Sequence, residues 1–463
     1  MRIISEWKEI DNWKKTGYIL TAILLFIFFI VFLYSDIIVT YRHSIAFLEH
    51  LFSGKFFEFY EYTLSHKHSG YPADYFLLIY IIFGIWNLPV WILTKVIGSI
   101  PESIALLWCK CIVLVFTWGT MKIIKKILAE IACEDIEFTS FSILSSLCFA
   151  IPIFATGQYD IISMFFILLG IYQCLKDDAI SWKVMTIFAV AMPIKMFSVF
   201  PYILLVFLKE KRILYIIRDI FVSMLGCVVC ALPFINQSAY YEAMSYNEVG
   251  VKALLRNTVS GGIAEIPVTL VAFFSLCVVA YVLKPKGKRM LGKYTIWLNA
   301  LFFVFFFILT EAHPYWSVLL LPFLIMCINN KEHLYISIVL EMVASVCLFV
   351  VQAYRYNWVY CSNTMASLVA KGIQVKYDYL GISNLADLID KLHLRIGVPV
   401  LYAGFAVAAV AVIILNCPWK EETIEISEEM ENSHKRVKST MYLIKPLALA
   451  FYCLVTFIVV YII

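Results

Sequence analysis

The chain has 463 residues, of which 62% are hydrophobic and only 15% are charged. Soluble domains carry roughly 25% charged residues, so this composition excludes a soluble globular protein and indicates an integral membrane protein. We expect no nucleic-acid partner; the formal net charge of +4 says little about this, and the distribution of charge along the chain is more informative.

Apolar runs recur along the whole chain, and each is long enough to cross a bilayer as a helix of about 20 residues. Backbone that crosses lipid must pair its own N–H and C=O groups, which favours helices for runs of this length. We therefore predict an all-α polytopic membrane protein with about 13 transmembrane helices. The predicted spans are 17–34, 102–128, 138–156, 159–175, 182–196, 198–208, 213–235, 264–283, 294–311, 313–329, 334–353, 396–416 and 445–463.

The segment before the first span, MRIISEWKEIDNWKK, lacks a small-residue cleavage site and is interpreted as a retained cytoplasmic lead-in. With the N-terminus in the cytoplasm, most of the 37 lysines and arginines fall in cytoplasmic loops, as the positive-inside rule requires. The apolar stretch 75–98 is then placed within the first external loop, as a helix or hairpin that enters the membrane and returns. We expect a multi-pass integral membrane protein, located in the plasma membrane if the chain is bacterial.

The first external loop begins with Asp36, where the first span ends. Arg42 and His43 follow, and residues 43–53 have apolar side chains at helical spacing, which suits a helix lying in the membrane interface. Ionisable residues at this depth are candidates for function. Asp36, Arg42 and His43 could equally be ordinary interface residues.

The sequence GQYD, residues 157–160, lies between the third and fourth predicted spans, on the same side as Asp36. Gln158 and Asp160 are costly residues beside apolar spans, which makes them functional candidates. The alternative for Asp160 is a helix cap, because an acidic residue suits a helix N-terminus.

Residues 182–208 provide too short a segment for two full crossings, which need about 40 residues. Pro193 and Pro201 interrupt the segment, so we expect a short pair of helices with an apex near Lys195. Irregular backbone at membrane depth is tolerated only where it lines a cavity, so Lys195 should face a polar cavity open to the outside. The alternative is a lysine that extends its charge to the interface.

Later external segments add Arg256, in the loop 237–262, and His313, which precedes a proline in TEAHPYW. Several polar residues on one side of the membrane suggest one shared cavity. The sequence shows no internal repeat. Residues 331–463 form a predicted C-terminal transmembrane region with an external loop at 354–395 and a cytoplasmic linker at 417–444.

These segments, in this order, resemble the GT-C superfamily of membrane glycosyltransferases, and especially its polyprenyl-phosphate-sugar-dependent, mannosyltransferase-like members. The resemblance covers about residues 17–325 and gives a predicted catalytic transmembrane module at 1–330. It rests on the acidic residue after the first span, on the interfacial helix, and on later motifs. Those motifs are YPAD (71–74), GQYD (157–160), MPIKMFSVFPYILLVFLKEKR (192–212) and HPYWSVLLLPFL (313–324). The family usually has a double proline where this chain has YPAD.

The resemblance implies transfer of a sugar, with inversion, from a polyprenyl monophosphate to a hydroxyl group. The acceptor would be a lipid-linked glycan, a cell-surface polymer or another molecule on the extracytoplasmic face. Asp36 would be the catalytic base, and Asp160 would orient the acceptor or support Asp36. No cofactor is required, although a divalent metal at Asp160 is possible. The residues expected to bind sugar or phosphate are Lys195, Gln158, His313, Arg256, Arg42 and His43.

Two other classes of function remain as alternatives. A polysaccharide polymerase or ligase would use a large late external loop, and 354–395 is such a loop. A transporter or flippase of lipid-linked sugars would show repeated halves and charges at mid-membrane.

Overall fold

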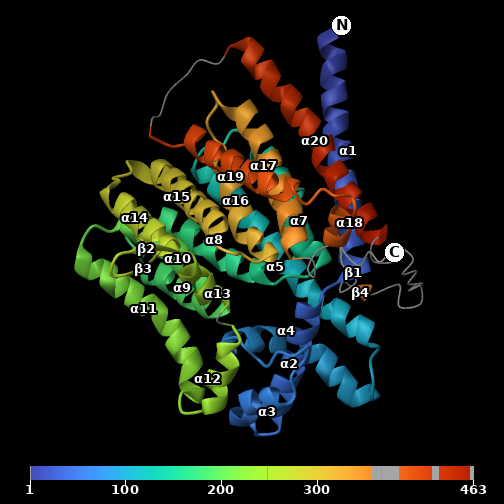
Figure 1. Cartoon of the computed structure of the whole chain (residues 1–463), viewed down its shortest axis with the longest axis vertical. Coiled ribbons are helices and arrows are strands. Elements are labelled where there is room, and N and C mark those ends of the chain that lie inside the picture. The colour runs from blue at the N-terminus through green and yellow to red at the C-terminus, as the bar shows by residue number, and fades with distance from the viewer. Residues whose placement is uncertain (1, 248, 357–365, 368–384, 420–426, 459–463) are drawn as a thin grey trace. The chain divides into compact units, whose positions relative to one another are not determined.

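The computed structural model describes the chain except for residues 1, 248, 357–365, 368–384, 420–426 and 459–463 (Figure 1). Almost every described element is a helix. The strands of the described residues form two short antiparallel ladders. One ladder pairs β1 (Phe32–Leu33) with β4 (Ala366–Ser367), and the other pairs β2 (Thr258–Gly261) with β3 (Ala264–Pro267). The prediction of an all-α protein is confirmed.

Eight helices in the described part of the chain are long and apolar enough to cross a membrane. They are Asn12–Val31 within α1 (Arg2–Val31), α4 (Leu77–Ile97), α5 (Glu102–Glu130), Ile213–Phe234, α15 (Gly287–Leu309), α17 (Leu334–Arg355), α19 (Gly397–Leu415) and α20 (Glu428–Phe457). The segment Ile213–Phe234 joins α11 (Ile213–Ala231) to the short helix η4 (Leu232–Phe234). The chain is therefore a multi-pass membrane protein.

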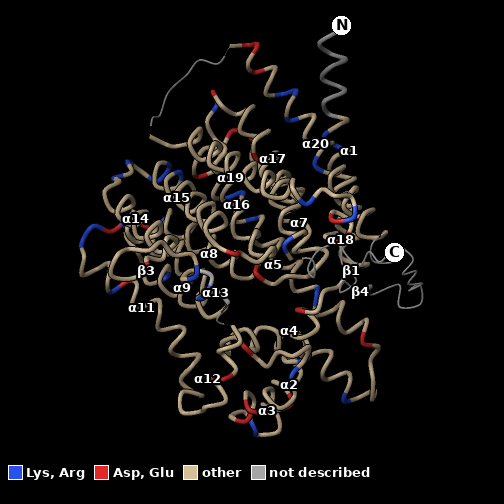
Figure 2. The backbone as a smooth tube through the Cα atoms, viewed as in Figure 1, with Lys and Arg blue, Asp and Glu red and all other residues tan. Residues whose placement is uncertain are grey.

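Shorter apolar helices complete the set among the described residues. They are Trp182–Ile194, Met196–Lys209, Val268–Val282 and Pro314–Cys327. A bent pair, Ile136–Leu144 with Leu147–Ala155, counts as a ninth long span if its two halves cross together. Figure 2 shows long uncharged stretches along the helices, and lysines and arginines gather where the chain passes from α14 (Val268–Val282) to α15. The figure of about 13 crossings stays a prediction.

The chain forms two compact units, each built from separate stretches of sequence. Unit 1 comprises residues 1–34, 128–157 and 313–463, and unit 2 comprises residues 35–127 and 158–312. The sequence-based division at residue 330 was drawn on function rather than on packing, and it stays a prediction.

In unit 1, α1 and α20 run side by side, and α17 packs against α19 (Figure 1). The rest of the unit consists of α6 (Ile136–Leu144), α7 (Leu147–Ala150), η2 (Ile151–Ala155), η5 (Pro314–Trp316), α16 (Ser317–Cys327) and α18 (Leu385–Lys391). The chain bends by 64° between α6 and α7. At this bend the Ser145 hydroxyl donates to the Phe141 carbonyl. Further along, Pro152 lacks an N–H with which to continue a regular α-helix, and it lies in η2, a π-helical turn.

The last helix, α20, is longer than the predicted span 445–463. It begins in the predicted linker, where the Ser427 hydroxyl accepts a hydrogen bond from the Met430 N–H. Glu428, Glu429 and Glu431 fill the first turn, where negative charge suits the helix dipole. A helix therefore replaces the second half of the linker, while residues 420–426 lie outside the described part of the chain.

Unit 2 carries the segment that was predicted to form the first external loop. Here α2 (Ser35–Phe52) packs against α4, and α3 (Phe59–Ser65), which follows η1 (Phe56–Glu58), packs against α12 (Ser238–Ser245). The expected interfacial helix is thus confirmed as a helix, and it begins earlier, at Ser35. Stretch 75–98 contains one uninterrupted helix, α4, so a hairpin is excluded.

The remaining helices of unit 2 carry Asp160 and Arg256, and Lys195 lies at the junction of two of them. These helices are α8 (Asp160–Lys176), α9 (Trp182–Ile194), η3 (Met196–Ser198), α10 (Val199–Lys209) and α13 (Val249–Arg256), with α11, η4, α14, α15 and all but the end of α5. Helix α9 packs against both α8 and α11, and α10 packs against α14 and α15.

Two glycines allow the close packing of α9. A Cβ atom added to Gly170 of α8 would come within 2.4 Å of the Phe188 ring. A Cβ atom added to Gly226 of α11 would come within 1.8 Å of the Ala189 carbonyl oxygen. Neither position has room for a side chain, so these glycines set how closely both neighbours approach α9.

Candidate functional site

Asp36 and Gln158 meet in unit 2, although 122 positions separate them in the sequence. The Gln158 side-chain amide donates a hydrogen bond of 2.8 Å to the Asp36 carboxylate. Gln158 is buried and Asp36 is half-buried, at the first turn of α2. A buried amide therefore fixes the orientation of the Asp36 carboxylate, and this arrangement suits a proton acceptor.

A buried ion pair is the second part of the site. The Lys195 ammonium lies 3.2 Å from the Asp160 carboxylate, and the exposed fractions of the two side chains are 9% and 0%. Apart from this ion pair, neither oxygen of Asp160 accepts a hydrogen bond from a described residue. The carboxylate therefore keeps acceptor capacity that a hydroxyl group could use.

Two tyrosines enclose the Lys195 ammonium. It donates a hydrogen bond of 3.2 Å to the Tyr75 hydroxyl, and it lies 5.0 Å from the centre of the Tyr75 ring and 5.5 Å from the centre of the Tyr159 ring. Both rings are placed for cation–π attraction. The ammonium thus has a fixed position rather than the mobility of a surface lysine.

Local backbone structure explains how the pair is built. Lys195 has an extended conformation (φ −153°, ψ 118°) between the end of α9 and the start of η3, which confirms the predicted short helix pair and its apex. Gly157 has a positive φ of 74°, which lets the chain turn into α8. Asp160 lies in the first turn of α8, yet its oxygens accept no backbone hydrogen bond from a described residue. Asp160 therefore does not cap α8 by hydrogen bonding, and Lys195 pairs instead of extending into solvent.

Burial changes the acidity of the carboxylates that lie outside the membrane-spanning helices. Burial raises the pKa of Asp36, and the hydrogen bond from Gln158 and the charge of Lys195 oppose this rise. Burial also raises the pKa of Asp74 to about 7; the Lys195 charge opposes this shift and the Asp36 charge adds to it. Asp74 comes from the YPAD sequence, so a second carboxyl group near Asp36 exchanges protons near neutral pH.

Arg42 and His43 have partners of their own. The Arg42 guanidinium lies 3.1 Å from the Glu102 carboxylate, and both side chains are about half exposed. His43 is buried, with its ring 5.4 Å from that of His68. Burial, together with the charge of His68, lowers the pKa of His43 to about 3, so its ring is neutral at physiological pH. His43 can donate or accept a hydrogen bond but cannot neutralise a phosphate.

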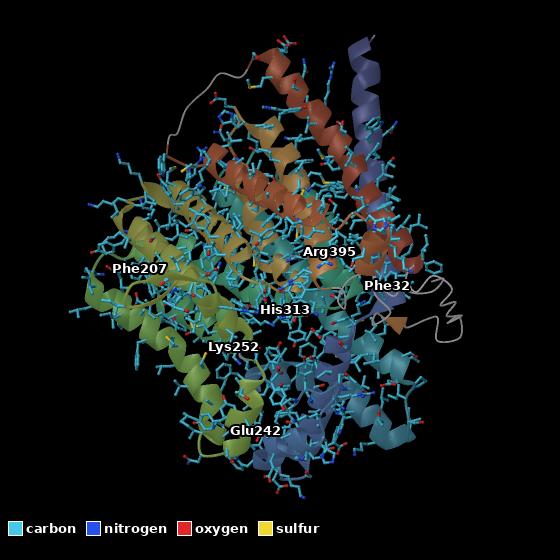
Figure 3. All side chains as sticks on the ribbon, viewed as in Figure 1. Phe32, Phe207, Glu242, Lys252, His313 and Arg395 are labelled. Carbon is cyan, nitrogen blue, oxygen red and sulfur yellow. The ribbon has the colours of Figure 1, made fainter. Side chains whose placement is uncertain are left out.

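The last two sequence candidates lie elsewhere. Arg256 is the last residue of α13, and its guanidinium lies 2.5 Å from the Glu311 carboxylate. Figure 3 shows two further charged residues of this region, Glu242 on α12 and Lys252 on α13. His313 belongs to unit 1, where its ring packs against Tyr315, Trp316 and Tyr356. The roles assigned to Arg256 and His313 stay predictions.

The described structure thus brings together Asp36, Gln158, Asp160 and Lys195, which we call the unit 2 cluster. Sequence reasoning missed Tyr75, Tyr159 and Asp74, which adjoin it. Tyr159 lies within GQYD, and Asp74 and Tyr75 end YPAD and follow it directly, so their proximity to quoted motifs could have identified them. Among the described residues, no group of three or more His, Cys, Asp or Glu side chains is arranged to hold a metal ion.

The chain matches no family model, and no curated protein or solved structure is significantly similar to it. Its function must therefore be inferred from the chemistry of the unit 2 cluster.

Proposed function

We propose that the chain is a GT-C-like membrane glycosyltransferase that moves a sugar, with inversion, from a polyprenyl monophosphate to an acceptor hydroxyl. The observation that supports this most directly is the unit 2 cluster, in which a carboxylate held by a buried amide adjoins a buried carboxylate–lysine pair. The acceptor is a lipid-linked glycan, a cell-surface polymer or another hydroxyl compound on the extracytoplasmic face.

In the proposed reaction, the acceptor oxygen attacks the anomeric carbon of the donor sugar and its proton passes to Asp36. The bond between the anomeric carbon and the phosphate oxygen breaks on the opposite face, and its electron pair leaves with the polyprenyl phosphate. Configuration at the anomeric carbon is thereby inverted. The hydrogen bond from Gln158 holds the Asp36 carboxylate in a fixed orientation for this proton transfer.

Lys195 supplies the charge that the leaving group needs. The phosphate gains negative charge as the glycosidic bond breaks, and a preorganised ammonium in a site poor in water stabilises that charge strongly. Asp160, Tyr75 and Tyr159 hold the ammonium in place before substrate binds. The free acceptor capacity of Asp160 would bind a hydroxyl of the sugar or the acceptor.

The remaining parts of the proposal concern architecture. The chain would cross the membrane about 13 times, with its N-terminus in the cytoplasm and the unit 2 cluster outside. The polyprenyl tail would lie in lipid beside the spans. The mechanism requires no cofactor, since a lipid monophosphate can leave with lysine stabilisation alone.

The test is a donor panel. Purified full-length protein in lipid nanodiscs is incubated with polyprenyl-phosphate sugars that carry radioactive label in the sugar, and with lipid-linked acceptor extracts. We expect one donor to be consumed and its sugar to appear on an acceptor. Asp36→Asn should lower the rate by about 10²- to 10⁴-fold, the usual contribution of a general base.

Asp177→Asn is the matched control, because Asp177 follows α8 at the end opposite Asp160 and bonds to Ser181 and Gln173 there. This variant should retain full activity. Transfer that survives Asp36→Asn would contradict the base assignment. Movement of labelled lipid across the bilayer without transfer would favour the transporter alternative. Extension of a glycan by whole repeat units would favour a polymerase.

A further inference from the structure

Unit 1 contains a second buried carboxylate–lysine pair, which is unconnected with the proposed reaction. Glu341 of α17 and Lys445 of α20 approach to 2.5 Å, and the exposed fractions of their side chains are 2% and 1%. Both helices are candidate membrane spans. Ionisable groups inside such spans are rare and costly unless paired, which marks this position for scrutiny.

Neighbouring polar groups complete the pair. The Ser345 hydroxyl donates to the second oxygen of Glu341 at 2.9 Å, and the Lys445 ammonium also donates to the Ser142 carbonyl at 3.3 Å. The hydroxyls of Ser345 and Ser146 lie 3.1 Å apart. Three helices therefore contribute to one hydrogen-bonded group in an otherwise apolar interior.

A cavity within unit 1 leads to this pair. It has a volume of about 30 Å³, enough for one or two waters, and Thr139, Ser142, Ile338 and Glu341 are among the residues that line it. Its wall also includes charged residues. Lys438 pairs with Asp135 at 3.0 Å, and Lys331 pairs with Glu134.

A wider hollow of about 390 Å³ adjoins the cavity, because Glu134, Lys331, Leu334 and Lys438 line both. His434, Lys435 and Glu431 complete the lining of the hollow. The two spaces together form a path from charged, partly exposed side chains to a buried carboxylate.

Two buried polar atoms beside this path have no hydrogen-bond partner among the described residues. They are the Ser142 hydroxyl oxygen and the Asn329 side-chain nitrogen, and both residues line the cavity. Ser142 is only 2% exposed. Buried polar groups are almost always hydrogen-bonded, and ordered water is the usual partner where protein supplies none.

We propose that the cavity binds water that reaches Glu341, so that the Glu341–Lys445 pair is a hydrated site where protons exchange with solvent. The ligand class is water together with the proton it carries. The water bridges the Ser142 hydroxyl and the Asn329 amide to the carboxylate. This inference concerns unit 1 alone and stands whether or not the unit 2 cluster transfers sugars.

Radiolytic hydroxyl-radical footprinting with mass spectrometry provides the first test, because radicals form wherever water is held. The full chain is irradiated in nanodiscs. Phe138 and Ile338 line the cavity and are 5% and 3% exposed, while Phe141 and Leu348, on the same two helices, are 1% and 2% exposed and do not line it. We expect several-fold faster oxidation of Phe138 and Ile338 than of their controls. Equal rates would overturn the proposal.

Water-edited solid-state NMR provides the second test. In protein labelled with ¹⁵N-lysine, magnetisation should pass from water to the Lys445 ammonium several-fold faster than to Lys110, another fully buried lysine. Lys445→Met assigns the signal. Ser142→Val fills the cavity with methyl groups and should slow the transfer. Transfer to Lys445 that is as slow as transfer to Lys110 in the unaltered protein contradicts the proposal, even if Ser142→Val fails to fold.

Discussion

The described part of the chain contains two buried carboxylate–lysine pairs, one in each unit, and they differ in how completely they are hydrogen-bonded. In unit 1 both oxygens of Glu341 have donors, Lys445 and Ser345. In unit 2 Asp160 has Lys195 beside it at 3.2 Å but accepts no hydrogen bond from a described residue. The same two kinds of side chain thus form a completed group in one unit and an incomplete one in the other.

This difference distinguishes a buried ion pair that stabilises the fold from one that takes part in a reaction. A completed pair has little capacity left for substrate, and its loss should cost stability first. An incomplete pair keeps capacity for a ligand, and its loss should cost activity first. Substitutions in and around the two pairs test this distinction, from the largest expected effect to the smallest.

Glu341→Gln should lower the free energy of unfolding by about 3–5 kcal/mol, because Lys445 would be left as an uncompensated buried charge. The double variant Glu341→Gln/Lys445→Met should recover most of that loss and keep full sugar transfer. Thermal unfolding in detergent measures the stability of both variants, and the donor assay measures their sugar transfer. A double variant that is stable but inactive would show that the unit 1 pair takes part in the reaction.

Lys195→Met should lower the rate of sugar transfer per folded molecule by about 10²- to 10³-fold, the usual cost of removing one group that stabilises transition-state charge. The double variant Asp160→Asn/Lys195→Met should recover stability without recovering activity. Both double variants would then recover stability, but only the unit 1 double variant would transfer sugar at the full rate. Recovery of activity in the double variant would remove Lys195 from the mechanism.

Tyr75→Phe should lower the rate about tenfold, since a hydrogen bond to a charged group contributes roughly 1.5 kcal/mol or more. The Tyr75 hydroxyl accepts from Lys195, so its loss frees the ammonium to move. Tyr354→Phe in unit 1, where the hydroxyl donates to Asp390 at the surface, is the control and should be neutral. Steady-state kinetics with the donor identified by the panel measures both variants. Equal rates for Tyr75→Phe and the unaltered protein would mean that the Tyr75 hydroxyl is not needed to position Lys195.

Gln158→Met should move the acid side of the pH–rate profile to higher pH. The base must be ionised, so activity falls as the pH falls through the pKa of Asp36. Burial has already raised that pKa, and Gln158 lowers it by a hydrogen bond to the charged form. Removing this bond therefore raises the pKa further. An unchanged profile would show that another group controls the acid side.

The sequence was sufficient to predict helices, polytopic character and the grouping of Asp36, Gln158, Asp160 and Lys195 on one side of the chain's predicted topology. This grouping followed from counting the predicted crossings. The number of positive charges in each loop predicts the side of the membrane on which that loop and its polar residues lie. Tyr75 and Tyr159 escaped notice because aromatic residues are common at membrane interfaces, and nothing in their spacing indicates a contact with Lys195.

The Glu341–Lys445 pair shows a different limit. Glu341 is a single acid inside an apolar run, and this could have drawn attention from sequence alone. Its partner lies 104 positions away on a helix that sequence reasoning began at residue 445. Which helices pack together depends on side-chain shape along their whole length, and hydropathy does not encode it.

The narrow contacts at Gly170 and Gly226 have a consequence for how mutations in this protein would be interpreted. Both glycines press on α9, the helix that ends at Lys195, yet neither touches the unit 2 cluster in the described structure. An alanine at Gly226 would have to push α11 away from Ala189, and the end of α9 would shift with it. A genetic screen for inactive variants would therefore recover substitutions of these glycines, which lie outside the unit 2 cluster, as well as substitutions of the charged residues. Such alleles would identify the helix packing that positions Lys195 rather than the chemical role of its ammonium group.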